Sequence, residues 1–314
     1  MKLAFIFPGQ GAQQVGMGTS LIETNETSAT LAQIADEQLP FSLTTLMKEG
    51  PQEVLTETYH TQPALLTVGT LVANELMQRG ITPDYVAGHS LGEYTALVAA
   101  NVMSFEDGVR AVYERGRFME EAVPNGEGAM AAVLGADREL LERITQDVSK
   151  TAPVQLANLN CPGQIVISGS AEGVALASER LKEEGIRRVM PLAVSGPFHS
   201  SLMERAADQL RASLTKIDFS PARFPLVANV NAQLVTDGEQ IREQLVEQLY
   251  SPVLWEDSMR RLIDEEGVTY FIECGPGKVL AGLMRKIDRN VTVVSVSDRE
   301  TMEEAVRLVE EWKA

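Results

Sequence analysis

Short apolar runs alternate with longer amphipathic segments along most of this 314-residue chain. The short runs have the length and β-branched content of buried strands, and the longer segments repeat apolar residues at helical spacing. Strands are therefore expected at residues 3–7, 84–87, 225–229, 269–274 and 291–296. Strands that alternate with helices predict an α/β fold with a mainly parallel sheet, covered by helices on both faces.

Several of the helices between these strands have recognisable ends. A long apolar helix is predicted to begin at Thr61-Gln62-Pro63 and to end at Gly80, because proline favours the first turn and glycine the C-terminal cap. Ser104 and Ser297 each precede an acidic residue by the spacing of a capping box. Both serines are therefore predicted to cap the helices that follow them.

The chain changes character at about residue 125, and residues 125–195 predict a small separate domain. Strands are expected at 128–134, 154–159, 164–168 and 187–194, and helices at 138–148 and 172–184. This β-α-β-β-α-β order is the split motif of ferredoxin-like folds. The chain is therefore predicted to contain a discontinuous large domain, residues 1–124 and 196–314, with a ferredoxin-like insert at 125–195.

The motif Gly88-x-Ser90-x-Gly92 lies where an expected strand meets an expected helix. Such a motif is typical of a nucleophile elbow, in which a sharp turn exposes the serine Oγ above the edge of the sheet. A Cβ at either glycine would crowd that turn. The motif occurs by chance in roughly one chain in ten of this length, so its strand-turn-helix setting carries the prediction. Ser90 is the candidate nucleophile.

A second glycine-rich stretch, Pro8-Gly9-Gln10-Gly11, follows the first expected strand. It lacks the third glycine of the dinucleotide motif G-x-G-x-x-G, and no acidic residue closes a following second strand. Nucleotide binding is therefore disfavoured. The free backbone N–H groups of such a loop can instead bind an anion or an oxyanion.

Arg115 interrupts an apolar seam that Val112, Met119 and Ala122 form on a predicted helix. The four residues are spaced at i, i+3, i+7 and i+10, so they share one face of the helix. A guanidinium in that position needs an anion. Two alternatives stay open from periodicity: Arg115 reaches solvent or pairs with a structural carboxylate, or it binds an anionic substrate.

Among the three histidines, His199 is the candidate general base. His60 lies in a polar connection, and the side chain of His89, next to Ser90, is expected to point away. The helix predicted after His199 disfavours the imidazolium at its N-terminus and so keeps the ring neutral. A hydrolase triad would place an acid between the serine and the histidine, but the aspartates there lie at helix starts or in the insert. A backbone or amide carbonyl is therefore expected to orient the ring.

Composition and charge narrow the function classes. The chain is 44% hydrophobic and has a formal net charge of −17, which opposes nucleic acid or an anionic membrane surface as the main partner. Cys161 and Cys274 are isolated and show no metal-ligand spacing, so we expect reduced thiols of a cytosolic protein and no metal site. The first apolar run is too short for a signal peptide, and no run reaches the roughly 18 apolar residues of a membrane span.

Eight motifs lie in order along nearly the whole chain: Phe7-Pro8-Gly9-Gln10-Gly11, Gln62-Pro63-Ala64, Gly88-His89-Ser90-Leu91-Gly92-Glu93-Tyr94, Arg115-Gly116, Asn160-x-Pro162-x-Gln164, Pro197-Phe198-His199-Ser200, Gln248-Leu249-Tyr250-x-Pro252-Val253-x-Trp255 and Gly275-Pro276-Gly277-Lys278-Val279-Leu280. Together they resemble the malonyl-CoA:acyl carrier protein transacylase family of bacterial fatty acid synthesis. The resemblance implies an α/β-hydrolase-like large domain with a ferredoxin-like insert, in agreement with the strand and helix pattern. It also implies malonyl-CoA and acyl carrier protein as partners, and no cofactor.

The resemblance assigns roles to residues of this chain. Ser90 would be the nucleophile, His199 the base, and Arg115 the residue that binds the malonyl carboxylate. The backbone N–H groups of Gln10 and Leu91 would form the oxyanion hole. Such a site would transfer the malonyl group in two steps, first to the serine and then to the carrier thiol.

Further residues are expected around this centre. The resemblance implies that the main-chain carbonyl of Gln248 orients the histidine, and we also expect Asn160 to take part in that orientation. Gln62 and Phe198 are expected to line the pocket. Because Phe198 adjoins His199, we expect it to exclude an α-methyl group and to favour malonyl over methylmalonyl.

A carrier-docking patch is predicted at Lys278, Arg285 and Lys286, because carrier proteins of this pathway are typically acidic and these residues follow the Gly-Pro-Gly loop. Three alternatives stay open. An acyltransferase for a polyketide carrier protein would keep every motif. A serine thioesterase would share the elbow without needing Arg115, and a silent carrier-docking protein would need neither the serine nor the histidine.

Overall fold

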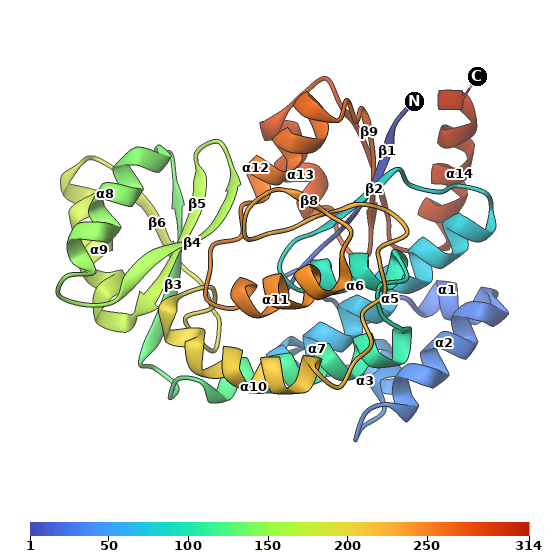
Figure 1. The fold of residues 1–314 in the computed structure, drawn as a ribbon, viewed down its shortest axis with the longest axis horizontal. Helices are drawn as coiled ribbons and strands as arrows, with labels where there is room; N and C mark the ends of the chain where they lie inside the picture. Colours follow the sequence, from blue (N-terminus) through green and yellow to red (C-terminus); the bar gives the residue numbers. More distant parts are fainter. Residues whose placement is uncertain (314) are drawn as a thin grey trace.

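The computed structural model describes residues 1–313, which form two separate sheets with helices around them (Figure 1). The larger sheet has six strands in the order β10-β9-β1-β2-β7-β8. These strands are β1 (Leu3–Phe7), β2 (Tyr85–Gly88), β7 (Leu226–Val227), β8 (Leu234–Val235), β9 (Tyr270–Cys274) and β10 (Thr292–Val296). Neighbours from β10 to β7 are parallel, and β8 is antiparallel to β7. The predicted α/β class with a mainly parallel sheet is confirmed.

Helices cover both faces of this sheet. They are α1 (Thr19–Thr24), α2 (Glu26–Glu37), α3 (Leu43–Glu49), α4 (Gln52–Thr56), α5 (Thr58–Gln78), α6 (Leu91–Ala99), α7 (Phe105–Glu121), α10 (Glu204–Leu214), α11 (Gly238–Gln248), α12 (Trp255–Arg260), α13 (Val279–Ile287) and α14 (Arg299–Lys313). Side chains of β1 alternate between two cores, as strand geometry requires: Phe5 and Phe7 pack with α5, α6 and α7, whereas Ala4 and Ile6 pack with α12 and α13. Within residues 1–313, no helix is long and apolar enough to cross a membrane.

Helix α5 begins earlier than its sequence predicts. Thr58, rather than Thr61, is its first residue, and Pro63 lies inside the helix. The backbone N–H of Thr58 donates to the carboxylate of Glu120 on α7, at 2.9 Å. A distant side chain therefore supplies the acceptor that the local sequence lacks, and the helix extends toward it.

The two serine caps have different outcomes. Ser104 caps α7 as predicted, because its hydroxyl accepts the N–H of Asp107 at 3.1 Å. Ser297 does not cap α14, and this prediction was wrong. Asp298 takes that position, and its carboxylate accepts the N–H of Thr301 at 2.9 Å. Since a carboxylate is also a good N-cap, the adjacent residue could replace the serine without changing the helix.

The strand expected at 225–229 is much shorter in the structure. Ladder pairing in β7 ends at Val227, and the N–H of Ala228 donates instead to the carbonyl of Gln233 at 3.0 Å. The chain therefore turns back into β8, which the sequence pattern did not predict. This turn releases Asn229 from the sheet and leaves its side chain free to contact the elbow.

The smaller sheet lies apart from the larger one, in the green and yellow part of the chain (Figure 1). Its elements are β3 (Gly128–Leu134), α8 (Arg138–Val148), β4 (Val154–Cys161), β5 (Gln164–Ser170), α9 (Ala171–Glu183) and β6 (Arg188–Pro191). The strand order is β4-β5-β3-β6, and every neighbouring pair is antiparallel. This is the arrangement of the predicted ferredoxin-like motif. The exact-residue boundaries 125 and 195 stay a prediction.

The small sheet is joined to the rest of the molecule through β4. The N–H of Val253 donates to the carbonyl of Ala157 at 2.8 Å, and the N–H of Leu159 donates to the carbonyl of Val253 at 2.9 Å. Val253 follows α11 closely in the chain. The end of α11 is therefore fixed against the insert, and this end carries Gln248.

Candidate active site

Ser90 occupies a strained corner between β2 and α6. Its backbone has φ 52° and ψ −107°, in a region that residues with a side chain rarely adopt. A Cβ on Gly88 would lie 1.9 Å from the carbonyl group of Gly92, and a Cβ on Gly92 would lie 2.0 Å from the carbonyl oxygen of Phe7. Both approaches are impossible for a larger residue, so the predicted crowding at the two glycines is confirmed.

Asn229 braces this corner from the end of the shortened β7. Its side-chain oxygen accepts the N–H of Ser90 at 2.8 Å, and its amide nitrogen donates to the carbonyl of Gly88 at 2.7 Å. The side chain is 1% exposed. Asn229 therefore holds the backbone on either side of His89, directly before the strained residue. Sequence reasoning missed it, because nothing in the local pattern distinguishes it from a strand end.

His199 lies against Ser90, although the two are far apart in the chain. The Oγ of Ser90 is 2.7 Å from Nε2 of His199, and Nδ1 of His199 is 2.8 Å from the carbonyl oxygen of Gln248. Because a carbonyl only accepts hydrogen bonds, Nδ1 carries the proton and Nε2 faces the serine with its lone pair. A backbone carbonyl therefore orients the imidazole, as the missing aspartate led us to expect.

Burial keeps this imidazole neutral. His199 is 3% exposed, and burial together with the nearby charge of Arg115 lowers the pKa of His199 to about 3. Both effects disfavour the imidazolium. At neutral pH the ring is therefore ready to accept the proton of Ser90.

Arg115 points into the same centre from α7. Its guanidinium donates to Oε1 of Gln62 at 2.8 Å, to Oε1 of Gln248 at 2.8 Å and to Oγ of Ser90 at 3.1 Å. The residue is 1% exposed, and burial lowers its pKa. Within residues 1–313 no salt bridge joins Arg115 to a carboxylate, and the buried guanidinium does not reach solvent. The arrangement can bind an anion beside the serine oxygen.

A buried carboxylate lies behind this arginine. Glu93 is 1% exposed, and its Oε2 accepts the side-chain N–H of Gln248 at 2.9 Å and the backbone N–H of Asn229 at 3.3 Å. Burial raises the pKa of Glu93 to about 7. These contacts fix the amide of Gln248 with its oxygen toward Arg115. Gln248 thus serves both the arginine, through its side chain, and the histidine, through its backbone.

These residues face a cavity of about 120 Å³. Gln10 and Leu91 line it, as do the predicted pocket residues Gln62 and Phe198. Leu91 is the first residue of α6, so its N–H has no acceptor within the helix. The insert contributes Leu192 to the lining. The cavity therefore brings together every residue predicted for the reaction itself.

The predicted role of Asn160 was wrong. Its side-chain oxygen accepts a hydrogen bond from Nε2 of His89 at 2.8 Å, and Nδ1 of His199 binds Gln248 instead. The ring of His89 also packs on Trp255, with 5.5 Å between ring centroids. Asn160 therefore orients the neighbour of the serine and not the candidate base. Sequence spacing could not decide which of the two histidines lies nearer to β4.

The residues predicted for carrier docking lie on the exposed side of α13. Lys278 precedes its first turn, and Arg285 and Lys286 lie in its last turn. The ammonium of Lys286 donates to the side-chain oxygen of Gln164 on the insert, at 3.2 Å. None of the three lines the cavity. They form a basic strip outside the reacting centre, and its use in docking stays a prediction.

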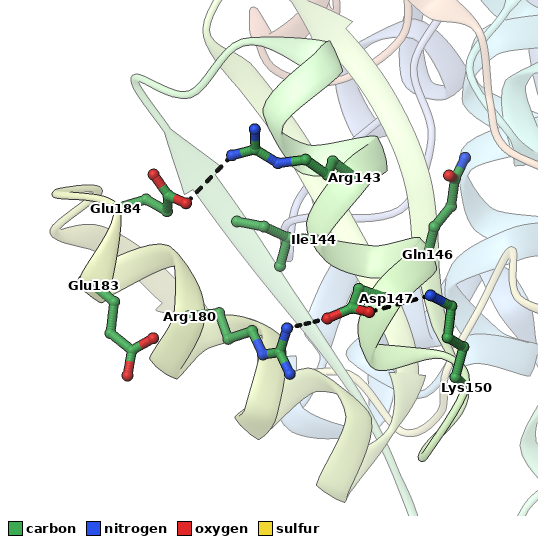
Figure 2. A pocket seen from close by; sticks show the side chains of 8 residues that line it. All are labelled: Arg143, Ile144, Gln146, Asp147, Lys150, Arg180, Glu183 and Glu184. Atoms are coloured by element: carbon green, nitrogen blue, oxygen red, sulfur yellow. Dashed lines mark hydrogen bonds and ion pairs between the residues drawn. The ribbon is translucent and has the colours of Figure 1, made fainter.

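A larger hollow, of about 540 Å³, lies between α8 and α9 on the insert, away from these residues (Figure 2). Five of its six charged side chains are paired with one another, whereas Glu183 contacts none of the other charged groups drawn (Figure 2). Arg143 contacts Glu184 at 3.2 Å, while Asp147 contacts both Lys150 and Arg180. Such exposed ion pairs are well solvated and contribute little to the stability of the fold. The lining of this hollow contains no serine, cysteine or histidine, so the smaller cavity at Ser90, where buried polar groups surround a serine, is the candidate active site.

Comparison with known proteins agrees with this site. An acyl transferase domain matches residues 4–307. The malonyl CoA-acyl carrier protein transacylase of Bacillus subtilis is 54% identical over 311 residues, covering 99% of this chain and 98% of its own length. The solved structure of the Clostridium perfringens protein of that name has a TM-score of 0.96 at 39% identity, covering 100% of this chain and 98% of its own. A malonyl-transacylase solved in complex with a type II PKS acyl-carrier protein has a TM-score of 0.94 at 39% identity, covering 98% of this chain and 100% of its own.

Proposed function

This chain belongs to the acyl transferase family, among the malonyl CoA-acyl carrier protein transacylases, and from that membership we propose how its residues carry out the transfer. The enzyme moves a malonyl group from malonyl-CoA to the phosphopantetheine thiol of acyl carrier protein, which supplies fatty acid elongation. We propose that the group passes through an ester on Ser90, so that the two thioesters react in turn. The reaction needs little driving force, because one thioester replaces another.

In the first half-reaction, Nε2 of His199 accepts the proton of Ser90 while Oγ attacks the thioester carbonyl. The backbone N–H groups of Gln10 and Leu91 donate to the oxyanion that forms. When this intermediate collapses, the carbon–sulfur bond breaks, and the imidazolium returns its proton to the departing CoA thiolate. The malonyl group then remains on Ser90 as an oxygen ester.

In the second half-reaction, the phosphopantetheine thiol of the carrier takes the place of CoA. Its proton passes to His199 as its sulfur attacks the ester carbonyl, and the same imidazolium then protonates the departing Oγ of Ser90. Water must be kept from the ester between the two steps, since it would release free malonate. The buried imidazole and the small cavity between the sheets support such protection.

One observation carries this proposal: a hydrogen-bonded chain runs from the Gln248 carbonyl through His199 to Oγ of Ser90, with Arg115 bound to the same oxygen. It is tested by mass spectrometry of the intact protein after brief exposure to malonyl-CoA. We expect a gain of one malonyl group, located on the peptide that contains Ser90. Detection of free malonate with no adduct and no CoA exchange would indicate a thioesterase instead.

Arg115 is expected to set the preference for a carboxylated acyl group. A malonyl carboxylate can accept two hydrogen bonds from the guanidinium, whereas an acetyl group leaves that buried charge unpaired. Arg115→Ala should lower kcat/KM for malonyl-CoA by about tenfold to hundredfold, the effect of losing a charge-assisted hydrogen bond. It should also raise the activity toward acetyl-CoA relative to malonyl-CoA. Both values are measured by steady-state transfer to the carrier.

The matched control for this prediction is Arg117→Ala. Arg117 lies on the same helix but is exposed, and it pairs with Glu121 at 3.1 Å. We expect this control to leave the malonyl-to-acetyl ratio unchanged. If Arg115→Ala also leaves the ratio unchanged, Arg115 is a structural residue and selectivity arises elsewhere.

Carrier binding is expected to use the basic strip Lys278, Arg285 and Lys286. The chain carries a net charge of −17, so an acidic carrier must meet a local positive surface against an unfavourable overall field. Reversing Arg285 and Lys286 to glutamate should raise KM for the carrier about tenfold, while KM for malonyl-CoA stays within about twofold. The two constants are measured separately by varying each substrate.

Reversal of Arg307 and Lys313 is the control for that experiment. Both residues are exposed on α14, and their reversal changes the net charge equally. We expect it to leave KM for the carrier nearly unchanged. An equal rise in both KM values for the α13 variant would mean that the strip does not dock the carrier.

A polyketide carrier is the second candidate acceptor, because one similar structure is a complex with a type II PKS acyl-carrier protein. Competition between a fatty acid carrier and a polyketide carrier in one assay, at equal concentration, decides between them. We propose that the reaction takes place in the cytoplasm, where the two free buried cysteines, Cys161 and Cys274, stay reduced. Phe198 lines the cavity, which supports its proposed exclusion of methylmalonyl groups.

A further inference from the structure

Gln155 places a side chain of the insert between two segments of the reacting centre. It lies on β4, and its Nε2 donates to the main-chain carbonyls of His199 and Tyr250, both at 3.2 Å. Its Oε1 accepts the backbone N–H of Ser201 at 2.9 Å. All three partners lie outside the small sheet. One side chain therefore connects the insert, the histidine segment and the end of α11.

The chemistry of these contacts suits an amide. Two carbonyls need two N–H donors, and the N–H of Ser201 needs an acceptor. The amide of Gln155 supplies all three in one planar group, so its orientation follows from its partners. A glutamate would keep the acceptor and lose both donors, and a methionine of similar size would lose all three contacts.

The contacts matter because the backbone of His199 is strained. Its φ is 56°, in the left-handed region that residues with a side chain adopt only when their surroundings hold them there. Gln155 binds the carbonyl of His199 and the N–H of Ser201, on either side of the intervening residue. It also binds Tyr250, which lies close to Gln248 in the chain. The hydrogen bond between His199 Nδ1 and the Gln248 carbonyl joins two chain segments, and the same amide binds both of them.

We propose that Gln155 is a positioning residue, through which the insert holds the general base in register with the carbonyl that orients it. This inference rests on the proposed role of His199. Gln155 does not line the cavity, so it acts through the histidine and touches no substrate. The small sheet therefore positions the general base, in addition to lining the pocket.

The test is the rate of malonyl-Ser90 formation in Gln155→Met, followed by rapid quenching and mass spectrometry. We expect the rate at saturating malonyl-CoA to fall about tenfold, since three backbone groups lose their partners and the imidazole loses its fixed orientation. The concentration of malonyl-CoA that gives half the maximal rate should stay within about twofold. A lower maximal rate at an unchanged half-saturating concentration distinguishes loss of base positioning from damage to the binding pocket.

A spectroscopic signature accompanies the kinetic test. The Nδ1 proton of His199 is buried and bound to a carbonyl, so it should give a resolved downfield proton resonance in the wild-type enzyme. In Gln155→Met that resonance should broaden or shift. Gln146→Met is the matched control, because Gln146 is exposed on α8 of the same insert, and it should change neither the rate nor the resonance.

If Gln155→Met fails to fold, Gln155→Glu tests the same point, because it keeps the acceptor for Ser201 and replaces the donors with a second acceptor oxygen. The inference is overturned if the folded variant forms the ester within twofold of the wild-type rate, or if slower acylation comes with an unchanged resonance. It is equally overturned if the half-saturating concentration rises as much as the rate falls. Wild-type enzyme that forms no ester on Ser90 would instead refute the proposed function, so the two failures are distinguishable.

Discussion

Replacement of Ser90 by alanine is expected to remove the malonyl ester and to lower transfer by about 10⁴-fold or more, the effect of deleting a nucleophile. The fold should remain intact, because alanine keeps the N–H that Asn229 accepts and is no larger than serine at the strained corner. Intact-protein mass spectrometry after malonyl-CoA should show no adduct. Thermal unfolding of the same sample should show a transition close to that of the wild type.

Ser178→Ala is a suitable control for this change. Ser178 lies on α9 of the insert, and its hydroxyl donates only to the carbonyl of Val174, so its loss should not affect transfer. A Ser90→Ala protein that still transfers malonyl groups at the wild-type rate would disprove the covalent mechanism. Residual transfer without an adduct, at a much lower rate, is compatible with direct attack promoted by the oxyanion N–H groups.

Local chemistry made the centre of the site predictable from sequence. Gly88 and Gly92 are required by close backbone contacts, and such requirements are visible in a motif. The position of Arg115 in an apolar seam likewise indicated a charged residue that needs an explanation, and the structure shows that this residue is buried. The absence of an acid before His199 indicated a carbonyl partner, which the structure identifies as Gln248. In each case the residue type itself violated an ordinary rule of burial or turn geometry.

The supporting residues could not be predicted, because their partners are distant in sequence. Asn229, Glu93 and Gln155 are ordinary polar residues in their local segments. Each acquires its role only when the fold brings a backbone group from a distant part of the chain within hydrogen-bonding distance. Asn160 shows the converse, since its motif was recognised but its partner was His89. Periodicity identifies elements and faces, and it carries no information on such pairings.

The predicted lengths of one helix and one strand were wrong for a related reason. Helix α5 extends to a carboxylate on α7, and β7 stops where its chain turns toward β8. The first end is determined by a tertiary hydrogen bond and the second by a tight turn, and neither follows from the hydrophobic pattern. The shortening of β7 has a functional consequence, because it places Asn229 at the elbow. The least predictable end of a strand is thus the one that supports Ser90.

As the pH is lowered, the rate of acylation is expected to fall only at a pH well below the usual pKa of a histidine. Burial and the charge of Arg115 lower the pKa of His199 to about 3, and a base acts only when it is unprotonated. Acylation kcat/KM, which reports the free enzyme, should therefore stay constant as the pH falls through about 6.5, the usual histidine value. In Arg115→Ala one of the lowering causes is absent, so the acid limb should move to higher pH.

Replacement of His199 by alanine is expected to slow acylation by about 10²–10⁴-fold, the usual contribution of a general acid and base. Ser90 keeps its oxygen and its contact with Arg115, so binding of malonyl-CoA should change far less than the rate.

His60→Ala is the control, because Nδ1 of His60 contacts the carbonyl of Val54 and not the serine. The measurement is the rate of ester formation at saturating malonyl-CoA, with and without added imidazole. Since the substitution leaves a space beside Oγ, imidazole should restore part of the rate in His199→Ala alone. A loss of less than about tenfold would remove His199 from the role of base and would leave the buried guanidinium as the group that activates Ser90.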